Sequence, residues 1–171
     1  NEHSINALLN GLFAIGDCQR ILFLYSKLSK NEVSLQTSRI LLKGFSDLKM
    51  ERQIIEIYES LKGFTDLDEL TLSYLVNALV KIEKIKEARE LIFKSENANT
   101  ITYSILIKGL AKHDIIQHAL DLIEEMKQNP KLKPNLVTYN TLLDAAVSQE
   151  DYTLMKKIYS EMKACDVGVD L

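Results

Sequence analysis

Residues 106–109 read Leu-Ile-Lys-Gly, a pair of aliphatic residues followed two positions later by a small residue. The same arrangement occurs five times along the chain. The copies are Leu8-Leu9-Asn10-Gly11, Leu41-Leu42-Lys43-Gly44, Leu75-Val76-Asn77-Ala78, Leu106-Ile107-Lys108-Gly109 and Leu142-Leu143-Asp144-Ala145. Their small residues stand 33, 34, 31 and 36 positions apart. Five copies of one unit therefore fill the chain, as in proteins built from tandem structural repeats.

Each unit is predicted to be a helical hairpin. Apolar residues recur at helical spacing, and segments of about 12 residues are separated by two to four polar ones, the loop lengths of antiparallel helices. Apolar residues also recur ten positions beyond the small residue (Ile21, Ile54, Ala88, Ala119, Met155) and fourteen beyond it (Tyr25, Tyr58, Ile92, Ile123, Tyr159). We expect the small residue to let the second helix approach the first closely. Because one hairpin cannot bury its apolar face alone, the sequence predicts an all-α solenoid of stacked hairpins.

The composition of the 171 residues is that of a folded protein, with 46% hydrophobic and 26% charged residues and a net charge of −3. No apolar run approaches the roughly 18 residues of a membrane span. Cys18 and Cys165 have no metal-ligand or redox spacing, which indicates single thiols in a reducing compartment. The predicted first helices (residues 3–14, 36–47, 70–81, 101–112 and 137–148) carry +3, and the rest of the chain carries −6. This balance excludes a strong electrostatic binder but not an RNA-binding protein.

Two stretches carry a resemblance to a known family. Val137-Thr138-Tyr139-Asn140-Thr141-Leu142-Leu143 and Ile101-Thr102-Tyr103-Ser104-Ile105-Leu106-Ile107 resemble the opening of the pentatricopeptide repeat (PPR), and Glu124-Glu125-Met126-Lys127 with Lys133-Pro134-Asn135 resembles its ending. The related tetratricopeptide repeat has a similar period, but its early Trp and its Leu-Gly…Tyr pattern are not seen. The resemblance implies a right-handed α-solenoid of helix-turn-helix repeats, a PPR/TPR-like superhelix. Its repeats would span residues 2–34, 35–68, 69–99, 100–135 and 136–170, within what we expect to be a longer protein.

The resemblance implies sequence-specific binding of single-stranded RNA, one base per repeat, on a concave face lined by the first helices. In the family the base is read by the fifth and the last residue of a repeat. The fifth residues here are Asn6, Arg39, Ser73, Ser104 and Asn140, and the last residues are Ser34, Asp68, Asn99, Asn135 and Asp170. Short polar side chains suit this role because an amide offers both a donor and an acceptor, and a hydroxyl adapts by rotation.

Family pairing rules give a target sequence. Ser73 with Asn99, and Ser104 with Asn135, resemble adenine readers; Asn140 with Asp170 resembles a uracil reader, and Asn6 with Ser34 a cytosine reader. Arg39 with Asp68 departs from the pattern, so base reading by the second repeat is doubtful. The expected target is 5′-CNAAU-3′.

Two further position classes belong to the predicted site. The second residue of a repeat packs on the base faces in the family, which gives Leu70, Ile101 and Val137 as clamps, with His3 and Gln36 at the same position. Lys81 and Lys112 stand at the thirteenth position, where the family contacts phosphate. If two phosphates are neutralised, the slope of log affinity against log salt is about −1.4.

Several alternatives stay open at this point. Ser73, Ser104 and Thr138 could cap amides in first turns, and Asn99 and Asn135 could cap the next helix as well as read a base. Arg39 could pair with Asp68 and close its own site, or contact a phosphate. The runner-up function is a protein–protein scaffold or a structural subunit of an organellar ribosome or other RNA-containing complex, and exposed aromatics in the groove would favour a peptide ligand.

No enzymatic activity, metal or cofactor is expected. His113 and His118 are five positions apart, which does not fit a helical metal pair, and no phosphate-binding loop or nucleophile elbow is present. Family membership implies mitochondria or plastids and a role in organellar RNA processing, stability, translation or editing.

Overall fold

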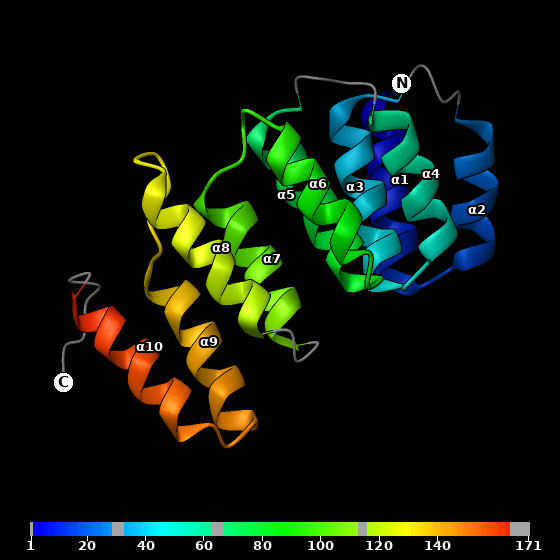
Figure 1. The fold of residues 1–171 in the computed structure, drawn as a ribbon. Coiled ribbons are helices and arrows are strands. Elements are labelled where there is room, and N and C mark those ends of the chain that lie inside the picture. Colours follow the sequence, from blue (N-terminus) through cyan, green and yellow to red (C-terminus); the bar gives the residue numbers. More distant parts are fainter. Residues whose placement is uncertain (1, 29–32, 63–66, 113–115, 165–171) are drawn as a thin grey trace. The chain divides into compact units, whose positions relative to one another are not determined.

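The computed structural model describes residues 2–28, 33–62, 67–112 and 116–164, and every regular element in these ranges is an α-helix. The first five helices along the chain are α1 (Glu2–Ile15), α2 (Cys18–Lys27), α3 (Leu35–Asp47), α4 (Glu51–Leu61) and α5 (Glu69–Lys81). The remaining helices are α6 (Ile85–Lys94), α7 (Thr100–Lys112), α8 (Ile116–Gln128), α9 (Leu136–Ser148) and α10 (Tyr152–Ala164), and they follow one another as helical hairpins (Figure 1). The predicted all-α repeat fold is confirmed. In the described ranges, each helix is too short or too polar to cross a membrane.

The helices form two compact units, Asn1–Lys84 with Ser95–Asn97, and Ile85–Lys94 with Ala98–Leu171. In the first unit α3 is central, because it packs against α1, α4 and α5. In the second unit α7 packs against α6, α8 and α9, and α9 packs against α10. Each odd-numbered helix thus contacts the next odd-numbered helix of its unit, so repeats stack through their first helices.

The two apolar positions on the second helices supply much of the core. Ile21, Ile54, Ala88 and Ala119 have no exposed surface, and Ile92 and Ile123 are 1% exposed. Around Phe45 of α3, the rings of Phe13 and Tyr25 pack edge-on with centroid distances of 5.4 and 5.1 Å. The repeated spacing in the sequence therefore marks real packing positions.

The expected role of the small residue is wrong for the two glycines of the first unit. A Cβ on Gly44 would overlap the Phe13 ring, so the side chain nearest to this glycine comes from the first helix of the preceding repeat and not from its own second helix. A Cβ on Gly11 would meet no atom within 4 Å. The sequence pattern predicts that a close contact occurs on the first helix at Gly44. It does not predict which neighbouring helix makes that contact, because the repeat spacing carries no information about the partner.

A tight turn joins the two helices of a hairpin. Gly16, Lys49, Glu83 and Glu150 have positive φ angles of 70°, 54°, 64° and 55°. Each stands five positions after the small residue of its repeat. A single residue in the left-handed region satisfies the last carbonyls of the first helix and reverses the chain.

Candidate nucleic-acid interface

A buried threonine follows four of the five residues that are predicted to be the last of a repeat, at the third position of the next helix. Thr37, Thr71, Thr102 and Thr138 are at most 4% exposed. Their backbone amides donate to the side chains of Ser34 (3.1 Å), Asp68 (2.8 Å), Asn99 (3.1 Å) and Asn135 (3.0 Å). These four predicted last residues are therefore also helix N-caps, as expected for Asn99 and Asn135.

The same threonine hydroxyls contact predicted fifth residues. Thr37 Oγ1 donates to Asn6 Oδ1 (2.8 Å), Arg39 Nε donates to Thr71 Oγ1 (2.8 Å), and Ser104 Oγ lies 3.0 Å from Thr138 Oγ1. The threonine thus connects the fifth residue of a repeat to the last residue of that repeat. The structure brings together the predicted pairs Asn6–Ser34, Arg39–Asp68 and Ser104–Asn135 in this way.

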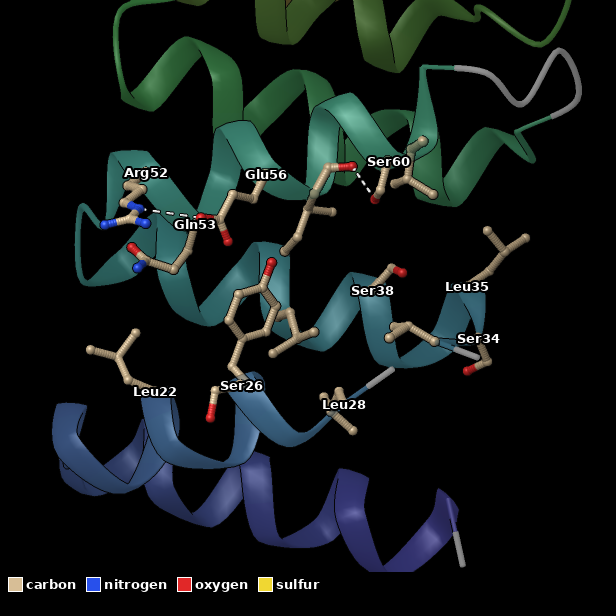
Figure 2. Close-up of a pocket in the computed structure, with 15 residues that line it drawn as sticks. Leu22, Ser26, Leu28, Ser34, Leu35, Ser38, Arg52, Gln53, Glu56 and Ser60 are labelled. Atoms are coloured by element: carbon tan, nitrogen blue, oxygen red, sulfur yellow. Dashed lines mark hydrogen bonds and ion pairs between the residues drawn. The ribbon is translucent and has the colours of Figure 1, made fainter. Parts of the chain in front are cut away.

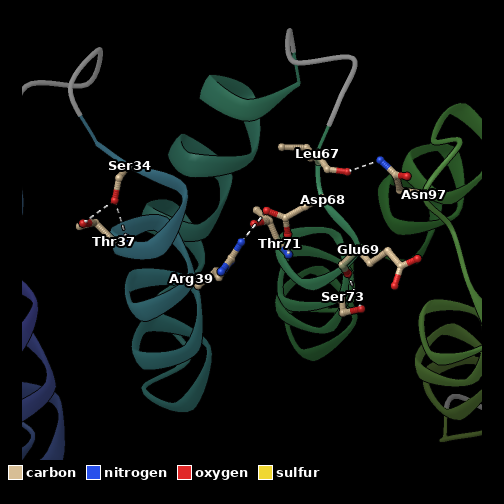
Figure 3. Close-up of polar contacts among 9 residues, drawn as sticks. All are labelled: Ser34, Thr37, Arg39, Leu67, Asp68, Glu69, Thr71, Ser73 and Asn97. Carbon is tan, nitrogen blue, oxygen red and sulfur yellow. Dashed lines mark hydrogen bonds and ion pairs between the residues drawn. The ribbon is translucent and has the colours of Figure 1, made fainter.

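The two serines predicted to read adenine do not cap amides, so that alternative is wrong for them. Ser73 Oγ donates to the Glu69 carbonyl (2.8 Å), and Ser104 Oγ donates to the Thr100 carbonyl (2.7 Å) (Figure 3 shows Ser73). Both side chains are half-buried. The helix orients each hydroxyl through this bond, and Ser104 Oγ also contacts Thr138 Oγ1 at 3.0 Å.

Arg39 forms an ion pair with Asp68, which was one of the two alternatives for this arginine (Figure 3). Arg39 Nη2 lies 2.5 Å from Asp68 Oδ2, and the side chains are 25% and 44% exposed. Burial favours the protonated carboxyl, but hydrogen bonds from Thr71 and the charge of Arg39 outweigh it and hold the pKa of Asp68 below its usual value. Asp68 is thus an ionised acceptor whose two oxygens both have partners.

The first-repeat pair differs from the expected open reader. Asn6 is 4% exposed, and its Nδ2 is a buried donor that meets no acceptor among the described residues. Ser34 Oγ contacts Glu2 Oε1 and lies 3.2 Å from Thr37 Oγ1. In the fifth repeat Asn140 is exposed, whereas its predicted partner Asp170 lies outside the described residues.

The predicted clamp positions are apolar and exposed. Leu70, Ile101 and Val137 are 53%, 60% and 65% exposed, and His3 and Gln36 at the same position are exposed as well. The large exposed aromatics Phe23, Phe93 and Tyr152 lie on second helices. Leu70, Ile101 and Val137 therefore expose aliphatic side chains, against which the faces of bases could pack.

The two predicted phosphate lysines have different surroundings. Lys81 Nζ lies 2.7 Å from Asp47 Oδ1, which is the residue at the same position of the preceding repeat. Lys112 is exposed, and no ion pair to it is found within the described ranges. Part of the positive charge of Lys81 is therefore already balanced.

Among the described residues, no three His, Cys, Asp or Glu side chains gather as a metal site. Cys165 and His113 lie outside the described residues.

Comparison with known proteins agrees with this geometry. The sequence model of the PPR repeat family matches residues 98–147, and that of the PPR repeat matches residues 137–167. The chain contains PPR repeats in residues 98–167. Ten helices in the described residues are consistent with about five repeats.

Curated PPR relatives are much longer than the chain. A chloroplastic pentatricopeptide repeat-containing protein of Arabidopsis thaliana is 31% identical over 100 residues, which are 56% of this chain and 13% of the relative. A second Arabidopsis thaliana protein of the same description is 35% identical over 78 residues, 45% of this chain and 12% of the relative. The chain therefore spans a small part of the length of such relatives.

Solved structures show the same fold. The crystal structure of the pentatricopeptide repeat protein PPR10 from maize matches with a TM-score of 0.77 at 19% identity, over 96% of this chain and 24% of that one. The crystal structure of PPR10 in complex with an 18-nt psaJ RNA element matches with a TM-score of 0.76 at 17% identity, over 98% and 26%.

Sequence analysis of this PPR chain missed the threonine contacts. The signal was present, because Thr37, Thr71, Thr102 and Thr138 stand at the same repeat position, but only Thr138 was singled out, and only as a cap. The contact between a threonine and the fifth residue of the preceding repeat joins residues 31 to 34 positions apart. Such a contact becomes visible only when the first helices are stacked.

The first unit also contains a cavity of about 1060 Å³ that is separate from most of these residues (Figure 2). It is lined by α2, α3 and α4, and Ser34 is the predicted site residue that reaches it. Tyr25 and Glu56 face each other there, and burial together with the Glu56 carboxylate raises the pKa of Tyr25 to about 12. Arg39, the predicted reader on α3 itself, does not line this cavity.

Proposed function

We propose that this PPR chain binds single-stranded RNA in a sequence-specific manner, one base per repeat, along the face of its first helices. The observation that carries the proposal is the recurring unit of a fifth and a last polar residue joined through a buried threonine. Exposed aliphatic side chains flank these units, as expected for surfaces that pack on bases. The likeness to PPR10, which was solved with an 18-nt RNA element, supports the same use of this fold.

The proposed target is 5′-CNAAU-3′. At the fourth repeat, the Ser104 hydroxyl and the Asn135 amide lie on either side of Thr138, which gives donors and acceptors for one base edge. The equivalent residues of the third repeat are Ser73 and Asn99. We assign adenine to both repeats, uracil to Asn140 with Asp170, and cytosine to Asn6 with Ser34. Burial of Asn6 means that the cytosine contact requires its unpaired Nδ2 to become accessible.

Binding is expected to be weak and only mildly dependent on salt. Lys81 and Lys112 are the proposed phosphate contacts, and two neutralised phosphates give a slope of log affinity against log salt of about −1.4. The exposed side chains at the clamp positions are aliphatic, so each stacked base contributes near or below the low end of roughly 1–3 kcal/mol. Exposed aromatic side chains in the groove would favour a peptide ligand. The clamp positions Leu70, Ile101 and Val137 are aliphatic instead, which favours RNA.

We further propose a non-enzymatic role in organellar RNA processing, stability, translation or editing, in mitochondria or plastids. Three of the relatives that match this chain are named chloroplastic. The alternatives are a scaffold that binds proteins and a structural subunit of an organellar ribosome or other RNA-containing complex. Crosslinking the native protein to cellular RNA and sequencing the bound fragments separates RNA binding from a purely protein-binding role.

A direct titration tests the proposal. The chain is titrated against fluorescently labelled 5′-CNAAU-3′ and against the same RNA with both adenines changed to guanine, and anisotropy is measured. We expect tighter binding of the adenine RNA, by about tenfold or more for two lost base contacts of at least about 1 kcal/mol each. Equal affinities for the two RNAs would remove the proposal.

A further inference from the structure

The guanidinium of Arg39 is held along one edge. Its Nε donates to Thr71 Oγ1 (2.8 Å), and its Nη2 donates to Asp68 Oδ2 (2.5 Å) (Figure 3). The Thr71 backbone amide fixes the other carboxylate oxygen of Asp68 at 2.8 Å, and Thr71 has no exposed surface. Two anchors on one edge of a planar group set both its position and its plane.

The opposite edge of the same guanidinium is open. Of the five N–H groups of an arginine, the two contacts above use one on Nε and one on Nη2. No acceptor for Nη1 is found among the described residues, and Nη1 is not one of the buried side-chain atoms that lack a partner. The Arg39 side chain is 25% exposed. A parallel pair of N–H donors, one on Nη1 and one on Nη2, is therefore accessible to solvent.

We propose that the second repeat selects guanine through this free edge of Arg39. Guanine places two acceptors, O6 and N7, side by side at the spacing of an arginine fork, and this is the most common specific arginine–base contact. Adenine replaces one acceptor with a donor, and uracil has a single carbonyl on the corresponding edge. Cytosine offers O2 and N3 as a second acceptor pair, so it is the main competitor. The inference rests on the proposed function and changes the target to 5′-CGAAU-3′.

The surroundings of Arg39 agree with this role. The neighbouring clamp positions, Gln36 and Leu70, are both exposed, and Leu70 is an apolar surface for a base face. The charge of Asp68 is compensated by Arg39, so the carboxylate does not repel the guanine carbonyl. Thr71 and Asp68 act as positioning residues, because they hold the fork without using its free edge.

The test is a titration of the chain with four RNAs that differ only in the second nucleotide of 5′-CNAAU-3′, and with a fifth that carries 7-deazaguanine there. We expect guanine to bind about tenfold more tightly than adenine or uracil, and 7-deazaguanine to lose this advantage because it lacks N7. Arg39→Lys keeps the charge but removes the fork, so it is expected to abolish the preference for guanine over adenine.

Thr71→Val is expected to reduce the guanine preference in part, because Nε then loses one of its anchors. Circular dichroism confirms that both variants are folded. Equal affinity for all four bases, or a preference for cytosine, would overturn the inference while leaving the proposed function intact, provided that adenine is still preferred at the third and fourth nucleotides. Failure to bind any of the RNAs would overturn the proposed function and the inference with it.

Discussion

Among single residues, the threonine at the third position of a repeat has the most contacts to the proposed readers. The Asn135 backbone N–H donates to Thr138 Oγ1 (3.4 Å), the Thr138 amide donates to Asn135 Oδ1 (3.0 Å), and the hydroxyl also lies 3.0 Å from Ser104 Oγ. The side chains on both sides of the proposed base are therefore ordered in the free protein. Ordering before binding lowers the entropy cost of recognition.

Removing this hydroxyl tests its role. Thr138→Val is expected to reduce the free energy of unfolding by about 1 kcal/mol, because the reciprocal cap and the contact with Ser104 are both lost. It is also expected to weaken the preference for adenine at the fourth nucleotide. Urea unfolding and RNA titration measure the two effects. In the control Thr141→Val, the lost hydroxyl donates to the Val137 carbonyl of its own helix, and the expected change in stability is within about 0.5 kcal/mol. Equal stabilities of the two variants would contradict the assigned role.

Among the helices, α3 connects most of the first unit, since it contacts α1, α4 and α5. Its contact with α1 depends on Gly44, which faces the Phe13 ring, and on Phe45, whose ring meets that of Phe13 edge-on. Stacking of first helices is what places the fifth residue of one repeat beside the third residue of the next. Changes at Gly44 therefore act on stability and on the spacing of the proposed readers.

Two glycines of the first unit form a matched pair for this claim. Gly44→Ala is expected to destabilise the chain by about 1–3 kcal/mol, because the new methyl group would overlap the Phe13 ring. Gly11→Ala adds the same methyl group in open space within a helix and is expected to stabilise by about 0.5–1 kcal/mol. Denaturant unfolding of both variants gives the comparison, and opposite signs are the expected result. A loss of stability at Gly11 as large as that at Gly44 would show that packing against Phe13 is not the cause.

Across the whole molecule, positive charge on the first helices is partly balanced by neighbouring repeats. Asp47 pairs with Lys81 at 2.7 Å, and the two side chains are 58% and 43% exposed, so the pair contributes little to stability. For RNA binding the pair matters more, since Asp47 competes with a phosphate for the same ammonium group. The net charge of −3 does not show this local pairing. Only the part of the Lys81 charge that Asp47 leaves unbalanced is available to a phosphate.

Asp47→Asn is expected to strengthen RNA binding and to bring the slope of log affinity against log salt closer to the value of about −1.4 for two full phosphate contacts, because Asp47 no longer competes with phosphate for Lys81. Titrations at several salt concentrations measure this change. Glu51→Gln is the control, since it also removes one negative charge and one ion pair, that with Lys84 at 3.2 Å, away from the proposed site. If both variants bind RNA equally tightly, the effect belongs to net charge and not to Lys81.

The fold could be predicted from the sequence because the repeat spacing and the helical periodicity agree at every level. The buried positions of α2, α4, α6 and α8 follow directly from that spacing, as Ile21, Ile54, Ala88 and Ala119 show. Contacts between repeats could not be predicted in the same way. The role of Gly44, the burial of Asn6 and the pairing of Lys81 with Asp47 all depend on which side chains of neighbouring helices meet. The base-reading roles themselves stay predictions that come from the family resemblance.

The most direct test of one base per repeat is to change a single last residue and follow two nucleotides. Asn135→Asp keeps a good N-cap but replaces an amide, which donates and accepts, with a carboxylate, which only accepts. RNAs based on 5′-CNAAU-3′, with the second nucleotide held constant, are varied at the third or the fourth nucleotide and titrated with both proteins. We expect the preference at the fourth nucleotide to move from adenine to guanine, whose N1–H and N2–H groups are donors, while the preference at the third nucleotide stays adenine. An unchanged fourth-nucleotide preference, or a change spread over both nucleotides, would contradict it.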